Sequence, residues 1–316
     1  MPAPLLEVIT DSSEVLSVTT PAKVNLWLEV YGKRDDGFHE IVSLMVPIGL
    51  RDQIDLDFAT SVDRLEVPDG GAPADSSNLM MAALQRARRS RDIPPIAMRL
   101  MKQIPAQAGL GGGSSNAAAL LACLHHRFAD PRGWSGVISD AAELGSDVPF
   151  FLGSGPCLVK GRGEVMEPLE GPIFDNESMF ASIWYPGFGL STADVYQQLS
   201  GPLTSGHSCR NFSIEDFRNR RGKFQYLYNR LFDGAQKLDA RISSISLLLE
   251  DLFPGRWIMT GSGSGFVIVA DSQDASSEDA CQLRKAIPRA LTLEDGFSER
   301  IFAESGIHVV PLLTQP

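Results

Sequence analysis

The sequence predicts an α+β fold divided between two domains. Segments with strand-like alternation and segments with helical periodicity follow one another, without the regular repeat that a doubly wound sheet requires. The chain has 316 residues, which is more than one hydrophobic core usually serves. A Gly-Pro and acidic stretch near residues 170–180 marks the boundary. We therefore expect an N-terminal domain over residues 1–172 and a C-terminal domain over residues 173–316.

Composition and charge exclude several classes of protein. Hydrophobic residues make up 43% of the chain and charged residues 21%, which is ordinary for a globular protein and excludes general disorder. The formal net charge of −11 disfavours nucleic acid as a partner. The best basic cluster, which contains Arg218, Arg220, Arg221 and Lys223, is typical of a solvated loop.

The cysteines and the apolar runs indicate the compartment. Cys123, Cys157, Cys209 and Cys281 are far apart and form no Cys-x-x-Cys pair, so they predict neither a zinc site nor a disulfide framework. The N-terminus has no basic flank or long apolar run, and the longest compact apolar run, residues 117–124, is too short to span a membrane. We expect a cytoplasmic protein with no membrane partner and no metal centre of its own.

Periodicity assigns the elements of the first half. β-Branched and aromatic residues, or strict alternation, predict strands at 24–31, 41–48, 52–58, 96–104 and 156–166. Helical spacing predicts helices at 78–89 and 115–128, and another that ends near 141–145.

The second half alternates in the same irregular way. Strands are predicted at 179–185 and 265–270, and helices at 226–238 and 242–252. Residues 199–223 contain glycine, proline, serine and mixed charges, so we expect an exposed insertion.

The most informative segment is the glycine-rich loop Pro105-Ala-Gln-Ala-Gly-Leu-Gly-Gly-Gly-Ser-Ser115. Its glycines disfavour both strand and helix, and they let backbone N–H groups converge. A helix follows at once, so its free N–H groups and positive dipole end point at the loop. The loop is therefore suited to a polyphosphate, and the hydroxyls of Ser114 and Ser115 can bond a phosphate oxygen or reach its magnesium ion.

Other glycine motifs do not fit this loop. A Walker A loop needs a lysine after its glycines, and no lysine follows Gly113. A dinucleotide fingerprint needs a third glycine where this sequence has Ser114. The remaining alternative is a flexible turn between strand and helix.

Single residues leave their roles open. Asp147, in Gly145-Ser-Asp-Val-Pro-Phe-Phe151, fits a helix N-cap and a catalytic base equally well. Taken singly, Lys23 is better explained as a surface ion-pair partner, and His39 as a structural histidine. The second glycine loop, Gly261-Ser-Gly-Ser-Gly265, fits either a bare turn or a close approach to a ligand.

Three segments together resemble the motifs of the GHMP kinase superfamily. They read Pro21-Ala-Lys-Val-Asn-Leu26, the loop at 105–115 with the following Asn-Ala-Ala, and Met259-Thr-Gly-Ser-Gly-Ser-Gly265. Two more, Lys33-Arg-Asp-Asp-Gly-Phe-His-Glu40 and the Asp147 segment, resemble the branch that phosphorylates a cytidyl-linked erythritol. The resemblance covers about residues 18–271, with the motifs in the family's order.

The resemblance implies a fold and a reaction. The expected fold is an N-terminal domain like ribosomal protein S5 domain 2 and a ferredoxin-like C-terminal domain, with the active site between them. The expected reaction uses ATP with Mg²⁺ to phosphorylate the 2-hydroxyl of a cytidine diphosphate-linked methylerythritol, in the non-mevalonate isoprenoid pathway. The enzyme is expected to be a monomer or a weak homodimer.

The resemblance also implies roles for residues. Lys23 and Asp147 match the catalytic pair, with Asp147 as the base. For the substrate, Asn25 matches a position close by, Phe38 and Tyr196 match aromatic walls around the cytosine, and His39 matches the reader of its edge. The positions that match the ATP site, the last two on the adenine side, are Pro105, Ala106, Gln107, Ala108, Gly109, Leu110, Gly111, Gly112, Gly113, Ser114, Ser115, Asn78 and Lys102.

Departures and rivals remain. Phe38 stands where tyrosine is usual, and Asn229-Arg230 stands where Asn-Asp is common, so Asn229 receives no role. The rivals are another GHMP kinase, acting on homoserine, mevalonate or a sugar, and an inactive binding protein on the same fold. His39 and Tyr196 favour the cytidyl substrate over the first rival, and the presence of Lys23 and Asp147 argues against the second.

Overall fold

The computed structural model describes residues 5–174, 179–199, 212–215, 224, 226–290 and 306–313. The chain forms two compact units that alternate along the sequence. The first unit comprises Met1–Lys23, Leu50–Ala106 and Gly111–Ser154, and the second comprises Val24–Gly49, Gln107–Leu110 and Gly155–Pro316. The expected domain boundary at residue 172 stays a prediction.

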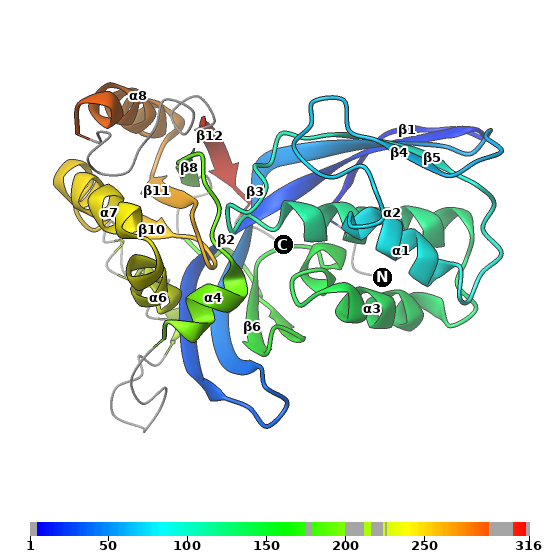
Figure 1. The fold of residues 1–316 in the computed structure, drawn as a ribbon, viewed down its shortest axis with the longest axis horizontal. Helices are drawn as coiled ribbons and strands as arrows, with labels where there is room; N and C mark the ends of the chain where they lie inside the picture. Colours follow the sequence, from blue (N-terminus) through cyan, green and yellow to red (C-terminus); the bar gives the residue numbers. More distant parts are fainter. Residues whose placement is uncertain are drawn as a thin grey trace. The chain divides into compact units, whose positions relative to one another are not determined.

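The first unit combines strands with a group of helices, and Figure 1 shows α1, α2 and α3 together on one side of β1, β4 and β5. Strand β1 pairs antiparallel with β2, β3 pairs antiparallel with β5, and β4 runs parallel to β5. The strands, of which β2 and β3 contribute residues to both units, are β1 (Glu7–Asp11), β2 (Val15–Lys33), β3 (His39–Asp57), β4 (Arg64–Glu66) and β5 (Ala97–Met101). The helices are α1 (Leu79–Ala87), α2 (Gly112–Arg127), α3 (Gly133–Leu144) and the short 3₁₀ helix η1 (Pro149–Leu152).

Helix α2 is the centre of the first unit. Every residue from Ala117 to Leu124 is buried, and the small alanines let α1, α3 and η1 pack closely against it. A buried ion-pair network joins the other two helices. The carboxylate of Asp140 on α3 accepts hydrogen bonds from Arg86 on α1 at 3.3 Å and from Arg132 at 2.5 Å.

The second unit contains the remaining elements. They are β6 (Cys157–Gly161), β7 (Val165–Pro168), β8 (Met179–Tyr185), α4 (Thr192–Gln197), β9 (Tyr228–Asn229), α6 (Leu231–Leu238), α7 (Ala240–Leu252), β10 (Trp257–Met259), β11 (Phe266–Ala270), α8 (Gln273–Ala290) and β12 (Gly306–Leu312). Strand β6 pairs with both β3 and β7, and β9 runs parallel to β2.

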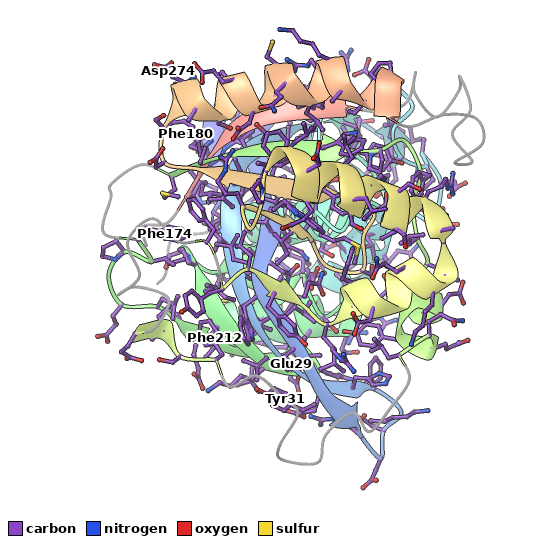
Figure 2. All side chains as sticks on the ribbon, turned by 90° about the vertical axis from the view of Figure 1, so that its left-hand side faces the viewer. Glu29, Tyr31, Phe174, Phe180, Phe212 and Asp274 are labelled. Carbon is purple, nitrogen blue, oxygen red and sulfur yellow. The ribbon has the colours of Figure 1, made fainter. Side chains whose placement is uncertain are left out.

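Four antiparallel strands of this unit follow the order β12-β8-β11-β10. In chain order the elements run strand, helices, two strands, helix, strand, which is the ferredoxin-like arrangement. Helices α7 and α8 lie side by side (Figures 1 and 2), and their buried faces join Trp184 and Phe266 in one apolar core. The expected ferredoxin-like C-terminal part is confirmed.

Several element predictions need correction. The strands expected at 41–48 and 52–58 are one continuous strand, β3, because Gly49 stays extended with Pro311 packed against it. The strand expected at 156–166 is the β6–β7 hairpin, since Gly161 and Gly163 take positive φ angles of 72° and 121° and turn the chain. The helix expected at 226–238 starts at Leu231 because β9 precedes it.

Some of the predicted features fall on residues outside the described ranges. Most of the expected insertion at 199–223, including its basic cluster, and Cys209 lie outside the described residues. Within the described part of the chain, every helix is too short or too polar to cross a membrane.

We predict that Asp140→Asn lowers the free energy of unfolding by about 1–3 kcal/mol, because a neutral amide weakens the charge-assisted hydrogen bonds that the buried carboxylate accepts from Arg86 and Arg132. The control is Glu66→Gln, which removes the exposed partner of Arg64 and should cost less than about 0.5 kcal/mol. Denaturant unfolding of both variants is the measurement. Equal stability losses would show that the Asp140 network contributes nothing beyond a surface ion pair.

Candidate active site

Lys23 and Asp147 form an ion pair in the first unit. Lys23 lies on β2 and Asp147 in the turn between α3 and η1, with 3.3 Å between Nζ and Oδ2. The lysine side chain is 4% exposed, whereas that of Asp147 is 38% exposed. The carboxylate is therefore held by a buried partner while part of it faces solvent. A general base needs this combination of fixed orientation and access.

The position of Asp147 relative to η1 tests the alternative hypothesis that this residue caps the helix. The N-cap of η1 is Val148, and no side-chain hydrogen bond caps the helix. The sequence alone left N-cap and base equally open for Asp147. In the structure Asp147 makes no capping hydrogen bond to η1, whereas its ion pair with Lys23 is present.

The glycine-rich loop leads directly into α2. Gly111 is the N-cap in the left-handed region, with φ of 71°, and a Cβ there would lie 3.0 Å from Cγ of Lys23. The first helical N–H bond runs from Ser115 to the carbonyl of Gly111. The N–H groups of Gly112, Gly113 and Ser114 therefore have no acceptor within the helix. Three such groups at a helix N-terminus can bind a phosphate, close to the stem of Lys23.

Three predicted ATP-site side chains make contacts inside the protein. The Ser115 hydroxyl donates to the carbonyl of Pro21 at 2.6 Å, so it ties the start of α2 to the segment before Lys23. Asn78 caps α1, accepting from the N–H of Met80 at 2.9 Å. Lys102 forms a buried ion pair, described below. The roles of all three toward ATP stay predictions.

In the second unit, Thr260 joins parts of all three motifs. Its hydroxyl accepts a hydrogen bond from the N–H of Asn25 at 3.1 Å and lies 3.4 Å from the carbonyl oxygen of Gly109. Gly109 has φ of 71°, and a Cβ there would overlap the carbonyl oxygen of Thr260. The N–H of Gly265 also donates to the carbonyl of Ala108 at 3.1 Å. The glycine loop at 261–265 and the adjoining Thr260 thus pack directly against Ala108 and Gly109.

Asn229 is a supporting residue that the sequence analysis left without a role. Its amide nitrogen donates to the carbonyls of Met259 at 2.6 Å and Gly261 at 2.8 Å, on either side of Thr260. Its amide oxygen accepts from the N–H of Leu231 at 2.9 Å. The sequence contained no local signal for this role, because Asn229 fell inside the helix predicted at 226–238, whereas α6 begins at Leu231.

The predicted base-binding residues lie in the second unit. The ring of His39 stacks on Tyr196, with 4.8 Å between ring centroids and 28° between planes. Phe38 is 49% exposed, and the guanidinium of Arg162 lies 4.9 Å from its ring centroid. The structure therefore brings His39 and Tyr196 together and places on Phe38 an arginine that the sequence analysis did not single out. A base held between Phe38 and Tyr196 stays a prediction.

Two further observations concern His39 and Asn25, both predicted to lie close to the substrate. Burial, together with the positive charge of Lys33, lowers the pKa of His39 below its ordinary value of 6.5, so the imidazole is neutral at pH 7. The buried amide of Asn25 donates to the hydroxyl of Ser43 at 2.7 Å, which fixes its orientation on β2.

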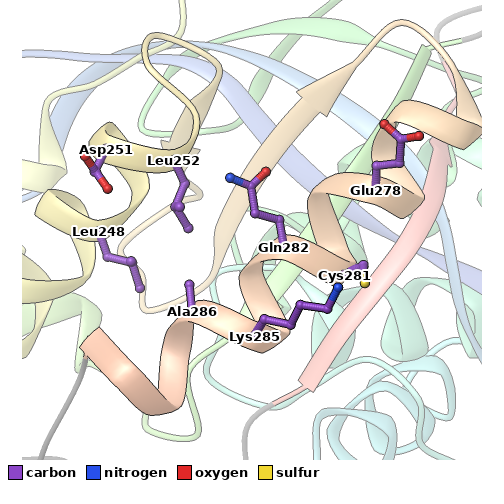
Figure 3. A pocket seen from close by; sticks show the side chains of 8 residues that line it. All are labelled: Leu248, Asp251, Leu252, Glu278, Cys281, Gln282, Lys285 and Ala286. Atoms are coloured by element: carbon purple, nitrogen blue, oxygen red, sulfur yellow. The ribbon is translucent and has the colours of Figure 1, made fainter.

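A groove elsewhere in the second unit contains none of the predicted site residues. It lies between α7 and α8 (Figure 3), with Leu248, Leu252 and Ala286 as its apolar part and charged side chains around them. Its lining offers no cluster suited to phosphate or base binding, so we do not place the active site there.

Comparisons with known proteins agree with this geometry. Residues 78–155 match the family model described as the GHMP kinases N terminal domain. A 4-diphosphocytidyl-2-C-methyl-D-erythritol kinase from Protochlamydia amoebophila (strain UWE25) is 32% identical over 279 residues, covering 86% of this chain and 90% of that protein. One from Methylacidiphilum infernorum (isolate V4) is 40% identical over 188 residues, covering 59% of this chain and 64% of that protein. A solved 4-(cytidine 5'-diphospho)-2C-methyl-D-erythritol kinase is similar in fold, with a TM-score of 0.69 and 26% identity, covering 94% and 98% of the two chains.

We predict that Asp147→Asn lowers kcat for phosphoryl transfer at least ~100-fold and leaves ATP affinity unchanged, because the amide cannot accept the proton of a hydroxyl. The matched control is Glu143→Gln, which alters an exposed carboxylate four residues earlier that pairs with Arg86. Steady-state kinetics and calorimetry measure the two effects. Near-normal kcat in Asp147→Asn would show that this carboxylate is not the base.

Proposed function

The chain belongs to the 4-diphosphocytidyl-2-C-methyl-D-erythritol kinase family, and we propose that it transfers the γ-phosphate of ATP to the 2-hydroxyl of that cytidyl alcohol. The observation that carries the proposal is the Lys23–Asp147 ion pair, in which the stem of Lys23 lies against Gly111, the N-cap of α2. A charged pair beside a helix N-terminus provides both a base and an anion site. The stacked rings of His39 and Tyr196 favour a substrate that carries a base over homoserine or mevalonate.

Each residue has a defined part in the proposed reaction. The carboxylate of Asp147 takes the proton of the substrate hydroxyl as its oxygen attacks the γ-phosphorus. The bond from that phosphorus to the bridging oxygen breaks, and ADP leaves. The ammonium of Lys23 orients the carboxylate and offsets negative charge that develops on the transferred group. The N–H groups at the start of α2 hold the phosphates of the nucleotide.

Magnesium is proposed to enter with the nucleotide. Nowhere in the described ranges do three or more histidine, cysteine, aspartate or glutamate side chains gather closely enough to hold a metal ion. Mg²⁺ that accompanies ATP is usually held by phosphate oxygens and water with one or two protein ligands. The hydroxyl of Ser114, at the start of α2, would fit such a part. The ion would offset phosphate charge during transfer.

Recognition of the base is proposed to rest on His39. A neutral imidazole can accept a hydrogen bond from the exocyclic amino group of cytosine, and uracil has a carbonyl oxygen at that place. The lowered pKa of His39 keeps the imidazole neutral at physiological pH. Tyr196 supplies a ring face that stacks on either pyrimidine. Selectivity and affinity are thus assigned to different residues.

We predict that Tyr196→Ala raises KM for the cytidyl substrate about 5- to 150-fold, because it removes one stacking surface. His39→Ala should raise KM similarly and also reduce the preference for cytidyl over uridyl substrate, which the tyrosine variant should keep. Both variants are assayed with both substrates at saturating ATP. If KM is unchanged in both, the base does not bind here, and the substrate of this kinase is a different alcohol.

We predict that Gly113→Ala weakens ATP binding without destabilising the fold. Its Cβ would meet only Cδ1 of Leu79, at 3.6 Å, and alanine is the better residue inside a helix by about 1 kcal/mol. Gly112 is a poorer probe, because a Cβ there would lie 2.9 Å from the side chain of Ile104. Calorimetry with ATP and thermal unfolding are compared. Unchanged ATP affinity in a stable Gly113→Ala variant would exclude this helix start as the phosphate site.

A further inference from the structure

A buried carboxylate lies beneath the phosphate loop in the first unit. Asp52, on β3, is 0% exposed and accepts four hydrogen bonds. One carboxylate oxygen accepts from Nζ of Lys102 at 2.5 Å and from the amide of Asn116 at 2.9 Å. The other accepts from the backbone N–H groups of Gln103 at 2.8 Å and Ile104 at 2.9 Å. No part of this charge is left without a donor.

The four donors stand at the two ends of the phosphate loop. Gln103 and Ile104 immediately precede Pro105, where the loop begins, and Asn116 lies in the second turn of α2, where the loop has ended. One carboxylate therefore joins the entry and the exit of the segment. The distance between these ends determines how the N–H groups between them are oriented toward a bound phosphate.

Lys102 adds a second contact to the same place. Its ammonium lies 3.0 Å from where a Cβ on Gly112 would stand, at the first residue of α2. A lone positive charge there would oppose the positive end of the helix dipole. Asp52 pairs with that charge, so the lysine supports the loop as part of a neutral pair with its side chain only 5% exposed.

We propose that Asp52 is a positioning residue for the nucleotide: its carboxylate fixes both ends of the 105–115 loop so that the N–H groups of α2 meet the phosphates. Lys102 then acts on ATP through this pair and through Gly112. The proposal rests on the proposed function, in which this loop binds ATP. Asp52 then affects ATP binding, but it affects neither the binding of the cytosine nor the chemical step.

The test is Asp52→Asn, which keeps the shape of the side chain and weakens its bonds to all four donors. Calorimetry should show a Kd for ATP raised about 10-fold, with KM for ATP rising in parallel. The kcat and the KM for the cytidyl substrate should stay within about twofold of the wild type. This split between ATP binding and turnover separates a positioning role from a general loss of folded protein.

Two further variants control for stability. Asp140→Asn alters a carboxylate of the same unit that is 2% exposed, and its partners Arg86 and Arg132 lie outside the loop. It should lose stability but keep the wild-type Kd for ATP. The double variant Asp52→Asn, Lys102→Met removes the unpaired buried ammonium, so it should regain stability without regaining ATP affinity.

The outcomes are distinct. A wild-type Kd for ATP in Asp52→Asn, or an equal rise in Asp140→Asn, would overturn the positioning role while the kinase assignment stands. Full recovery of ATP affinity in the double variant would also overturn it, because the loss would then come from the stranded lysine. A wild-type protein that binds no ATP would overturn the proposed function together with this inference.

Discussion

The constraint on which the rest depends is that a phosphate-binding loop must leave its own N–H groups unbonded. A loop of this kind cannot hold its shape through backbone hydrogen bonds, so other residues must hold it. In the first unit, Gly111 packs on Lys23, and Asp52 joins residues before and after the loop. In the second unit, Gly109 packs against Thr260. The glycines are required where these contacts leave no room for a side chain.

The chemistry follows from the same packing. Because Gly111 has no side chain, the stem of Lys23 lies against the start of α2, and the lysine then holds Asp147. The close approach of Gly111 to Lys23 thus positions the anion site, the ammonium group and the carboxylate next to one another. The predicted cytosine site is built differently, from the rings of His39 and Tyr196 on separate elements of the second unit. Selectivity for the alcohol can therefore change without altering the phosphate loop.

Sequence reasoning predicted the fold class, the kinase family and most strands and helices, because these depend on local periodicity and on compact motifs. It could not find Asp52 as a supporting residue, since the donors at Gln103 and Ile104 are 51 and 52 residues away. Asn229 was missed for the same reason, as Gly261 lies 32 residues along the chain. The Arg162–Phe38 contact depends on the β6–β7 turn, which was taken for continuous strand.

The most direct measurement is the transfer of the γ-phosphate from ATP by the wild-type protein, with mass analysis of the alcohol product. The cytidyl methylerythritol substrate is compared with homoserine and mevalonate under the same conditions. We expect a singly phosphorylated cytidyl product, ADP in equal amount, and no product from the other two alcohols. Phosphorylation of homoserine or mevalonate in place of the cytidyl alcohol, or release of ADP without any phosphorylated alcohol, would contradict the assignment.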